Sequence, residues 1–227
     1  MTKQLYIVPE HEFEAAHGLP ETLPANEVIR WQGAPDWKTL AVQAFHLRKL
    51  AIYFTIILCL RGIFALADGA TVSEATVSVL GLLPLALLAL AIVSLLAWLT
   101  ARTTVYTITN ERVVMRIGIV LSITFNLPFR SLDSVGIKRF SNGMGDIPIT
   151  VSVRDKIAYL HLWPHARPWH ITRAEPMLRS IADVAAVANI LSEAMADASG
   201  GVVTPVVVGA KPDATSNKAV NNMATAT

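Results

Sequence analysis

Residues Val79–Gly118 read VLGLLPLALLALAIVSLLAWLTARTTVYTITNERVVMRIG, and this stretch decides the fold. Its first part, Val79–Ala101, holds 23 residues without a charged side chain, enough for a helix that crosses a hydrocarbon layer of about 30 Å. After Arg102 the sequence changes to β-branched residues that alternate with polar ones, which is typical of strands with one buried face. The stretch therefore predicts a transmembrane helix that continues directly into a β-rich domain.

A second apolar run lies upstream of this one. Leu50–Ala67 is interrupted only by Arg61, and as a helix it measures about 27 Å, which suffices for a span. The segment between the two runs, Asp68–Ser78, has two acidic residues and no basic one, whereas basic residues flank the outer ends. Because basic residues are enriched on the cytoplasmic side, we expect spans at 50–67 and 79–101, cytoplasmic termini and a periplasmic loop.

The composition agrees with a membrane protein, since 53% of the residues are hydrophobic and only 16% are charged. Five residues are expected at the membrane–water interface: His46, Arg48, Lys49, Trp98 and Arg102. Arg61 lies within a span, and two interpretations are open: its side chain extends toward Asp68, or it contacts another helix or subunit. The first twenty residues lack the apolar core of a signal peptide, so we expect a cytoplasmic N-terminus.

Short alternating runs predict several strands after the second span. Thr103–Gly118 has the pattern of a hairpin around Asn110-Glu111, and runs at 123–128, 147–153 and 158–163 predict further strands. Pro176–Ala196 carries apolar residues at spacings of three and four, which predicts an amphipathic helix. We therefore expect a small barrel or sandwich over 102–198, closed by the helix at 176–196. Residues 1–49 are expected to pack against it, and 199–227 to form a disordered tail.

The segment Leu160–Ile171, LHLWPHARPWHI, gathers three histidines, two tryptophans and two prolines, and three interpretations are open. The histidines could converge on a metal ion, although nothing in their spacing requires it. The prolines could fix a turn whose aromatic rings cover the end of the domain. Alternatively the segment presents an exposed patch that binds a partner, since Trp and Arg dominate protein interfaces. The residues of this patch are Trp163, His165, Arg167 and Trp169.

Other classes of site have little support in the sequence. The single cysteine, Cys59, lies in an apolar run, so no cysteine-based metal site is expected. The formal net charge is +2 and no basic block is present, which argues against a nucleic-acid partner. The chain has no GxSxG motif and no glycine-rich phosphate loop. We therefore expect no catalytic residues, no metal and no enzymatic activity.

Several segments resemble known families. Residues Ala25–Trp37, ANEVIRWQGAPDW, the two spans and VYTITNERVVMRIG are similar to bacterial pleckstrin-homology-like (PH-like) membrane proteins, in which a helical hairpin precedes a PH-like barrel. Between residues 13 and 196 the chain also resembles the PuhB-type photosynthetic complex assembly proteins of purple bacteria. The segments that carry this resemblance are FEAAHGLPETLP, FHLRKLAIYF, FNLPFRSLDS, GDIPI and AYLHLWPHARPW. It implies an α+β membrane protein in which a two-helix transmembrane hairpin is followed by a cytoplasmic PH-like barrel or sandwich with a C-terminal helix.

The resemblance also implies a function. It implies a non-catalytic factor in the cytoplasmic or intracytoplasmic membrane that helps to assemble the photosynthetic reaction centre and core light-harvesting complex. The expected partners are reaction-centre subunits, light-harvesting polypeptides or other assembly factors, and membrane lipid. A homodimer is also expected, because small residues in the second span allow helices to approach closely: Ala86, Ala89, Ala91 and Ala97.

Two further possibilities stay open. No cofactor is expected, although His46 could contact a bacteriochlorophyll instead of serving as an interfacial anchor. The alternative function is a PH-like adaptor that binds anionic lipid headgroups. The basic residues available for that role are Arg130, Lys138, Arg139, Arg154 and Lys156.

Overall fold

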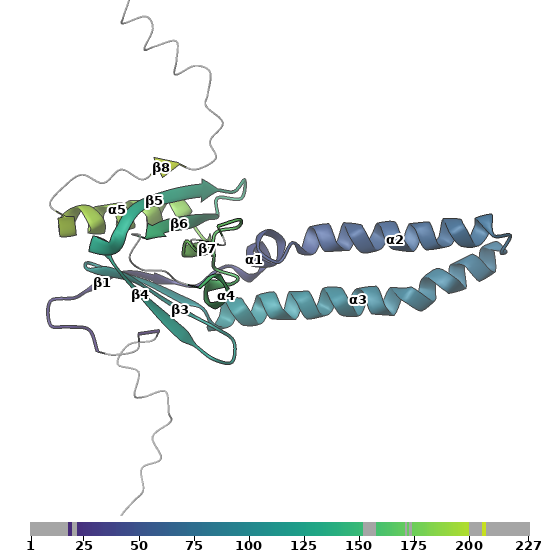
Figure 1. The fold of residues 1–227 in the computed structure, drawn as a ribbon, viewed down its shortest axis with the longest axis horizontal. Helices are drawn as coiled ribbons and strands as arrows, with labels where there is room; N and C mark the ends of the chain where they lie inside the picture. Colours follow the sequence, from purple (N-terminus) through teal and green to yellow (C-terminus); the bar gives the residue numbers. More distant parts are fainter. Residues whose placement is uncertain are drawn as a thin grey trace, which may run out of the picture.

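Two long helices lie side by side and extend from one end of a β-rich domain (Figure 1). A computed structural model describes residues 18–19, 22–151, 158–170, 172, 174–199 and 206–207. The helices are α2 (Leu47–Ala67) and α3 (Val72–Thr103). Both are long and apolar enough to cross a membrane, which confirms the predicted two-helix hairpin.

The turn between the two helices is shorter than predicted. The expected loop over 68–78 is wrong in extent, because α3 already begins at Val72. Thr71 is its N-cap: the Thr71 hydroxyl accepts from the Glu74 amide, and the Glu74 carboxylate accepts from the Thr71 amide. This reciprocal capping box starts the helix seven residues before the apolar run begins, so the turn comprises only residues 68–71.

Small residues form the face of α3 that packs inside the hairpin. Ala75, Ala86 and Ala97 are buried, and their spacing of eleven residues returns each to the same side of the helix after three turns. On the opposing helix, Gly62 lies so close to Val79 that an added Cβ would stand 3.4 Å from a Val79 methyl group. Most other side chains of the pair are exposed, as expected for a surface that faces lipid.

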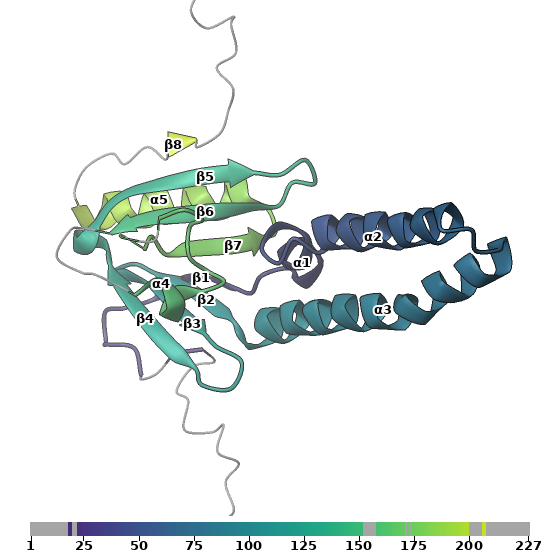
Figure 2. The same ribbon diagram turned by 45° about the vertical axis from the view of Figure 1, so that its right-hand side comes forward.

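The β-rich domain consists of two packed sheets (Figures 1 and 2). The first has the antiparallel order β1 (Ile29–Gly33), β2 (Val105–Thr109), β3 (Arg112–Ile117) and β4 (Ile123–Pro128). The second has the order β7 (Met177–Ile181), β6 (Gly145–Val151), β5 (Leu132–Arg139) and β8 (Val206–Val207), with β8 parallel to β5. Among the described strands no pairing joins the two sheets, so the expected barrel or sandwich is a sandwich.

The core of the domain lies between the sheets and under α5 (Val184–Ser199). It includes alternate residues of the strands together with one face of the helix, which packs on β5 and β6. Fully enclosed examples are Ile108, Met115, Ile149, Leu178 and Leu191. The hairpin predicted around Asn110-Glu111 and the strand at 123–128 are confirmed as β2–β3 and β4.

The predicted helix at 176–196 is wrong in its first part. Residues Met177–Ile181 form β7, which pairs with β6, and α5 begins only at Val184. Apolar residues at 177, 181 and 184 fit a helical spacing. In the structure, however, Met177–Ile181 pairs with β6 as an edge strand, and all five of its residues are buried. Ser180 and Asp183 have positive φ angles of 53° and 49°, which interrupt a continuous helix.

The strand predicted at 158–163 is also wrong. Tyr159–Leu162 forms a one-turn helix, α4, that buries Leu162 and leaves Leu160 exposed. Pro164, one residue beyond the C-cap Trp163, cannot donate to a strand ladder, so the segment turns away from the sheets. The predicted strand at 147–153 is β6, at 145–151, and residues 152–157 lie outside the described part of the chain.

Both ends of the chain add a strand to the domain. Residues 29–33 form β1, which pairs with β2, although residues 1–17 lie outside the described range. Two residues of the predicted disordered tail, Val206 and Val207, form β8 instead, and α5 extends to Ser199. The rest of that prediction, 200–205 and 208–227, falls on residues outside the description.

Candidate functional site

The helical hairpin and the domain meet without a linker. Helix α3 ends at Thr103, Thr104 caps it, and β2 begins at Val105. A short helix, α1 (Trp37–Gln43), lies beside this connection, and its N-cap Asp36 donates its amide to the Ser180 carbonyl at 2.9 Å. We call this region, formed by α1, the end of α3, the α4 segment and β7, the junction.

A buried histidine occupies the centre of the junction. His165 is fully enclosed, and both ring nitrogens have partners: Nδ1 lies 2.6 Å from Tyr106 Oη, and Nε2 lies 3.2 Å from Thr104 Oγ1. Tyr106 Oη already accepts from the Arg179 amide at 3.2 Å, so its own proton is available for Nδ1. With that proton on the tyrosine, Nε2–H donates to the Thr104 hydroxyl, so both ring nitrogens of His165 and the Tyr106 hydroxyl have partners.

The protonation states follow from burial. Loss of water lowers the pKa of His165 to about 3, with a smaller contribution from the Arg179 guanidinium, so the imidazole is neutral at physiological pH. Burial also raises the pKa of the Tyr106 phenol, which keeps it protonated. His165 was predicted to belong to an exposed partner-binding patch, and this is wrong because its ring faces inward and has no free nitrogen.

A second buried group, which the sequence did not reveal, extends this network. Arg179 on β7 is only 6% exposed, and burial lowers its pKa while the Asp146 carboxylate opposes that shift. Asp146 accepts from the Ser180 amide at 2.9 Å. Among the described residues, Arg179 Nε and Ser180 Oγ have no hydrogen-bond partner. The sequence offered one sign of this buried arginine, namely a basic residue in the otherwise uncharged run MLRSI at 177–181.

The outer side of the same segment is apolar and exposed. Trp169 is 92% exposed and Trp163 55%, and Leu160 lies on the neighbouring turn with 84% exposure. Trp169 has a φ of 67°, an uncommon conformation for a bulky residue, which the surrounding turn imposes. We call the exposed residues Leu160, Trp163 and Trp169 the tryptophan turn.

The remaining predicted residues of this segment have local partners. Arg167 is partly buried and pairs with Glu175 at 2.7 Å, while His170 Nδ1 lies 3.0 Å from the Pro168 carbonyl. Of the four residues predicted for the patch, the structure therefore places Trp163 and Trp169 outside, Arg167 at the edge and His165 inside. Within the described residues, no group of three His, Cys, Asp or Glu side chains is placed to hold a metal ion.

The residues predicted for the membrane interface lie around the hairpin base. The Arg102 guanidinium lies over the Trp98 ring, 5.7 Å from its centre, at a distance that allows a cation–π interaction. The two residues therefore lie on the same side of α3. His46 caps α2 with a φ of 55° and is exposed; partial burial and then Lys49 lower its pKa. Arg61 is exposed on α2, and no ion pair with Asp68 is found in the described chain.

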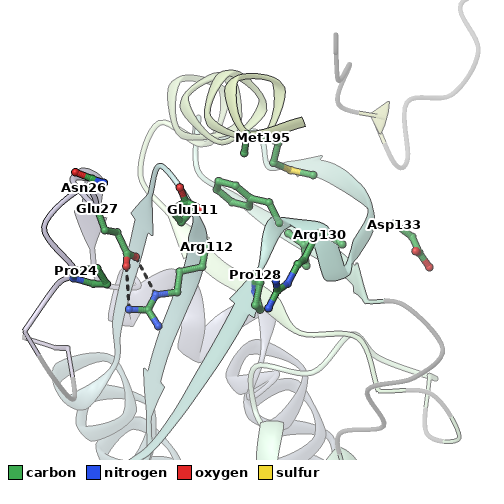
Figure 3. Close-up of a pocket in the computed structure, with 12 residues that line it drawn as sticks. Pro24, Asn26, Glu27, Glu111, Arg112, Pro128, Arg130, Asp133 and Met195 are labelled. Carbon is green, nitrogen blue, oxygen red and sulfur yellow. Dashed lines mark hydrogen bonds and ion pairs between the residues drawn. The ribbon is translucent and has the colours of Figure 1, made fainter. Parts of the chain in front are cut away.

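A cavity of about 700 Å³ lies at the other end of the domain. Figure 3 shows Glu27 and Arg112 pointing toward each other at its side, with Met195 of α5 above them and Arg130 across the opening. Glu27 accepts from two nitrogens of Arg112, at 2.9 and 3.1 Å, and its side chain is only 4% exposed. This pair ties the N-terminal segment to β3, a contact that sequence reasoning missed.

Comparisons with known proteins identify the family. The bacterial PH domain family matches residues 60–195, from the second half of α2 into the C-terminal part of α5. The chain is also 37% identical over 187 residues to a 23.7 kDa protein in the puhA 5′ region of Rhodobacter capsulatus. The aligned residues make up 82% of this chain and 87% of the relative. No solved structure matches the chain significantly. The protein therefore belongs to the bacterial PH domain family, and its relative agrees with the PuhB-type resemblance seen in the sequence.

Proposed function

We propose that the protein is a non-catalytic, membrane-anchored factor for the assembly of the photosynthetic reaction centre and core light-harvesting complex. The observation that carries the proposal is the tryptophan turn, an exposed aromatic surface at the base of the transmembrane hairpin, where Trp163 packs against Phe45. The relative in the puhA 5′ region supports the link to photosynthesis. The proposed location is the cytoplasmic or intracytoplasmic membrane, with the domain and both termini on the cytoplasmic side.

The tryptophan turn has the chemistry of a protein interface. Exposed tryptophans contribute most of the binding energy in many interfaces, provided that their conformation is fixed before binding. Here the buried His165 side chain anchors the backbone from below, while Arg167 and Glu175 brace its edge. A partner that reaches this surface must itself lie close to the bilayer, which suits the cytoplasmic surface of a membrane-embedded reaction-centre subunit.

The buried polar network supports a structural role for its members. A histidine beside a tyrosine can serve as an acid–base pair, but such a site needs access for a substrate. His165 and Tyr106 are both fully enclosed, and each of their polar atoms is bonded within the domain. The network therefore fixes the shape of the junction on which the tryptophan turn is displayed.

The alternative of a headgroup-binding adaptor has less support. Such a surface needs its basic residues on one side, next to the bilayer. Arg130 lines the cavity at the far end of the domain, whereas Lys138 and Arg139 end β5 near the junction. Arg154 and Lys156 lie outside the described residues. The described basic residues are thus divided between the two ends, which favours a protein partner.

Affinity purification tests the proposal. The tagged protein is isolated in mild detergent from cells grown phototrophically, and its absorption spectrum and co-purifying proteins are determined. We expect reaction-centre subunits and bacteriochlorophyll bands with the wild type and their loss with Trp169→Ala. A colourless preparation that contains only lipid would contradict the assembly function. A second copy of the chain with a different tag, expressed in the same cells, tests the proposed homodimer.

A further inference from the structure

The turn between β3 and β4 has an unusual composition. Turns at the surface are normally built from Gly, Asn, Asp, Ser or Pro, and a run of exposed apolar residues there requires a functional reason. This turn contains Ile119, Val120 and Leu121 in succession, and Val120 and Leu121 are 91% and 82% exposed. The preceding turn, at Asn110-Glu111, is polar. The two turns of one sheet thus differ in chemistry.

Strand register places the apolar turn at the membrane side of the domain. Val105, the first residue of β2, pairs with Arg116, and Ile117 pairs with Ile123. The residues 118–122 therefore extend past the point at which α3 becomes β2, while Asn110-Glu111 lies at the opposite end of β2. Both ribbon views show the tip of the β3–β4 hairpin on the side from which α3 leaves (Figures 1 and 2).

The reach of the turn matches the interfacial band of α3. Trp98 precedes Thr104 by six residues, which corresponds to about 9 Å along a helix. The turn extends two to three residues past Ile117, or about 7 to 10 Å in an extended chain. The two lengths are of the same size, and the turn lies on the side of the domain from which α3 leaves. There the Arg102 guanidinium lies over the Trp98 ring, and aromatic and basic residues mark the headgroup region.

The turn holds its apolar residues in a fixed shape. Gly118 has a φ of +121°, and a Cβ on it would collide with the carbonyl of Leu121. Only glycine permits this close approach of backbone to backbone, so the chain folds back tightly and directs the three side chains outward. Ile123, at the start of β4, continues the exposed apolar surface.

We propose that Ile119, Val120 and Leu121 insert into the bilayer at the boundary between headgroups and acyl chains. The turn is then a second membrane contact that, together with α2 and α3, sets the orientation of the domain against the membrane. The inference does not rest on the proposed assembly function, because it concerns only this chain and lipid.

Site-directed fluorescence in lipid tests the insertion. Cys59 is the single cysteine, so Cys59→Ser provides a cysteine-free full-length chain in one step. Val120→Cys in this background is labelled with the environment-sensitive dye NBD and reconstituted into nanodiscs of phosphatidylglycerol and phosphatidylethanolamine. A fraction of the lipid carries a nitroxide near the headgroup end of its acyl chain. Glu111→Cys, in the polar turn at the far end of the same sheet, is the matched control.

We expect the Val120 label to emit at shorter wavelength than the Glu111 label and to lose most of its intensity to the lipid nitroxide, whereas the Glu111 label loses none. A label at Ile119→Cys should show the same quenching and lose it when Val120 and Leu121 are both replaced by Asp. Equal emission and no lipid quenching at Val120, with near-ultraviolet circular dichroism unchanged, would overturn the proposal and point to a protein partner for the turn.

Discussion

The indole ring of Trp163 lies against the phenyl ring of Phe45, with ring centroids 5.4 Å apart and ring planes at 76°. Phe45 immediately precedes His46, the N-cap of α2, so this edge-to-face contact joins the tryptophan turn to the transmembrane hairpin. Trp169 is almost wholly exposed, and no ring contact of its side chain is found in the described chain. The two tryptophans therefore have separable roles.

Replacement of Trp169 by alanine should weaken partner binding without loss of stability. A tryptophan at the centre of an interface typically contributes 2 kcal/mol or more, so we expect at least about a tenfold loss of affinity. Recovery of reaction-centre subunits by the tagged protein measures the effect, and the thermal unfolding midpoint should not change. Full recovery with Trp169→Ala would show that this residue is no contact.

Replacement of Trp163 by alanine should affect stability as well. Loss of the ring contact with Phe45 should cost about 1 kcal/mol. Phe45→Leu tests the same contact from the other side and removes nothing from the exposed surface. Equal unfolding midpoints for wild type, Trp163→Ala and Phe45→Leu would contradict the structural role of this pair.

Acid should destabilise the domain through His165. Its pKa is about 3 in the folded state and about 6.5 when unfolded. Between these values the unfolded chain binds a proton that the folded chain cannot, so stability is lost as pH falls from about 6.5 toward 3. Between pH 7 and pH 5 this group alone should cost about 2 kcal/mol, measured by thermal unfolding in detergent.

The variant His165→Gln isolates this contribution. The raised pKa of Asp146, caused mainly by burial, acts in the opposite direction because the folded state takes up that proton more readily. Comparison of the variant with the wild type removes the Asp146 effect, which both share. We expect the variant to be less stable at pH 7 and less sensitive to acid between pH 7 and 5. Parallel pH curves for the two proteins would contradict the assignment of His165 as a buried neutral group.

The Glu27–Arg112 pair should stabilise the attachment of the N-terminal segment. Arg112→Met leaves the buried Glu27 carboxylate without its partner, which should cost about 2 kcal/mol. The exposed pair Arg30–Asp197, at 3.2 Å, is the matched control, and Arg30→Met should cost less than about 1 kcal/mol. Chemical unfolding in detergent measures both. Similar losses for the two variants would show that burial does not distinguish these pairs.

The buried alanine face of α3 should tolerate no larger side chain. Ala86→Leu places three additional carbon atoms between α2 and α3, and overpacking of this kind costs about 1 to 3 kcal/mol. Ala91→Leu, on an exposed part of the same helix, is the control and should be neutral. Thermal unfolding of the full chain in detergent compares the two. Ala86 is already buried within the hairpin, whereas Ala91 is exposed. If Ala91→Leu weakens self-association and Ala86→Leu does not, the face that carries Ala91 contacts the second copy.

Hydrophobic pattern alone predicted the transmembrane hairpin, the β2–β3 hairpin and the helix that covers the domain. These elements depend on local signals: long apolar runs, alternation with a period of two, and spacings of three and four. The start of α5 was misplaced because Met177, Ile181 and Val184 satisfy the helical spacing even though the first two lie on a strand. For so short a run, the neighbouring strand β6 decides between helix and strand.

The candidate site was predicted only in part. Composition predicted that Trp163 and Trp169 are exposed, which the structure confirms, but the same reasoning assigned His165 to the exposed side. Their role in an interface stays a prediction. The apolar turn Ile119–Leu121 was visible as three consecutive apolar residues after Gly118, yet its meaning depends on the end of the sheet at which it lies.

The sequence by itself determined two helices long and apolar enough to cross a membrane and a β-rich domain after them, because apolar run length and alternation report directly on lipid and on sheet. The bacterial PH type of that domain followed from the resemblance of whole segments to known proteins and not from these patterns. Only the tertiary structure decided which polar residues are enclosed. His165, Arg179 and Asp146 come together from three separate segments, and Tyr106 completes their network from the strand that follows α3. Within this network the contacts join residues up to 73 positions apart, and no local pattern in the sequence records such contacts.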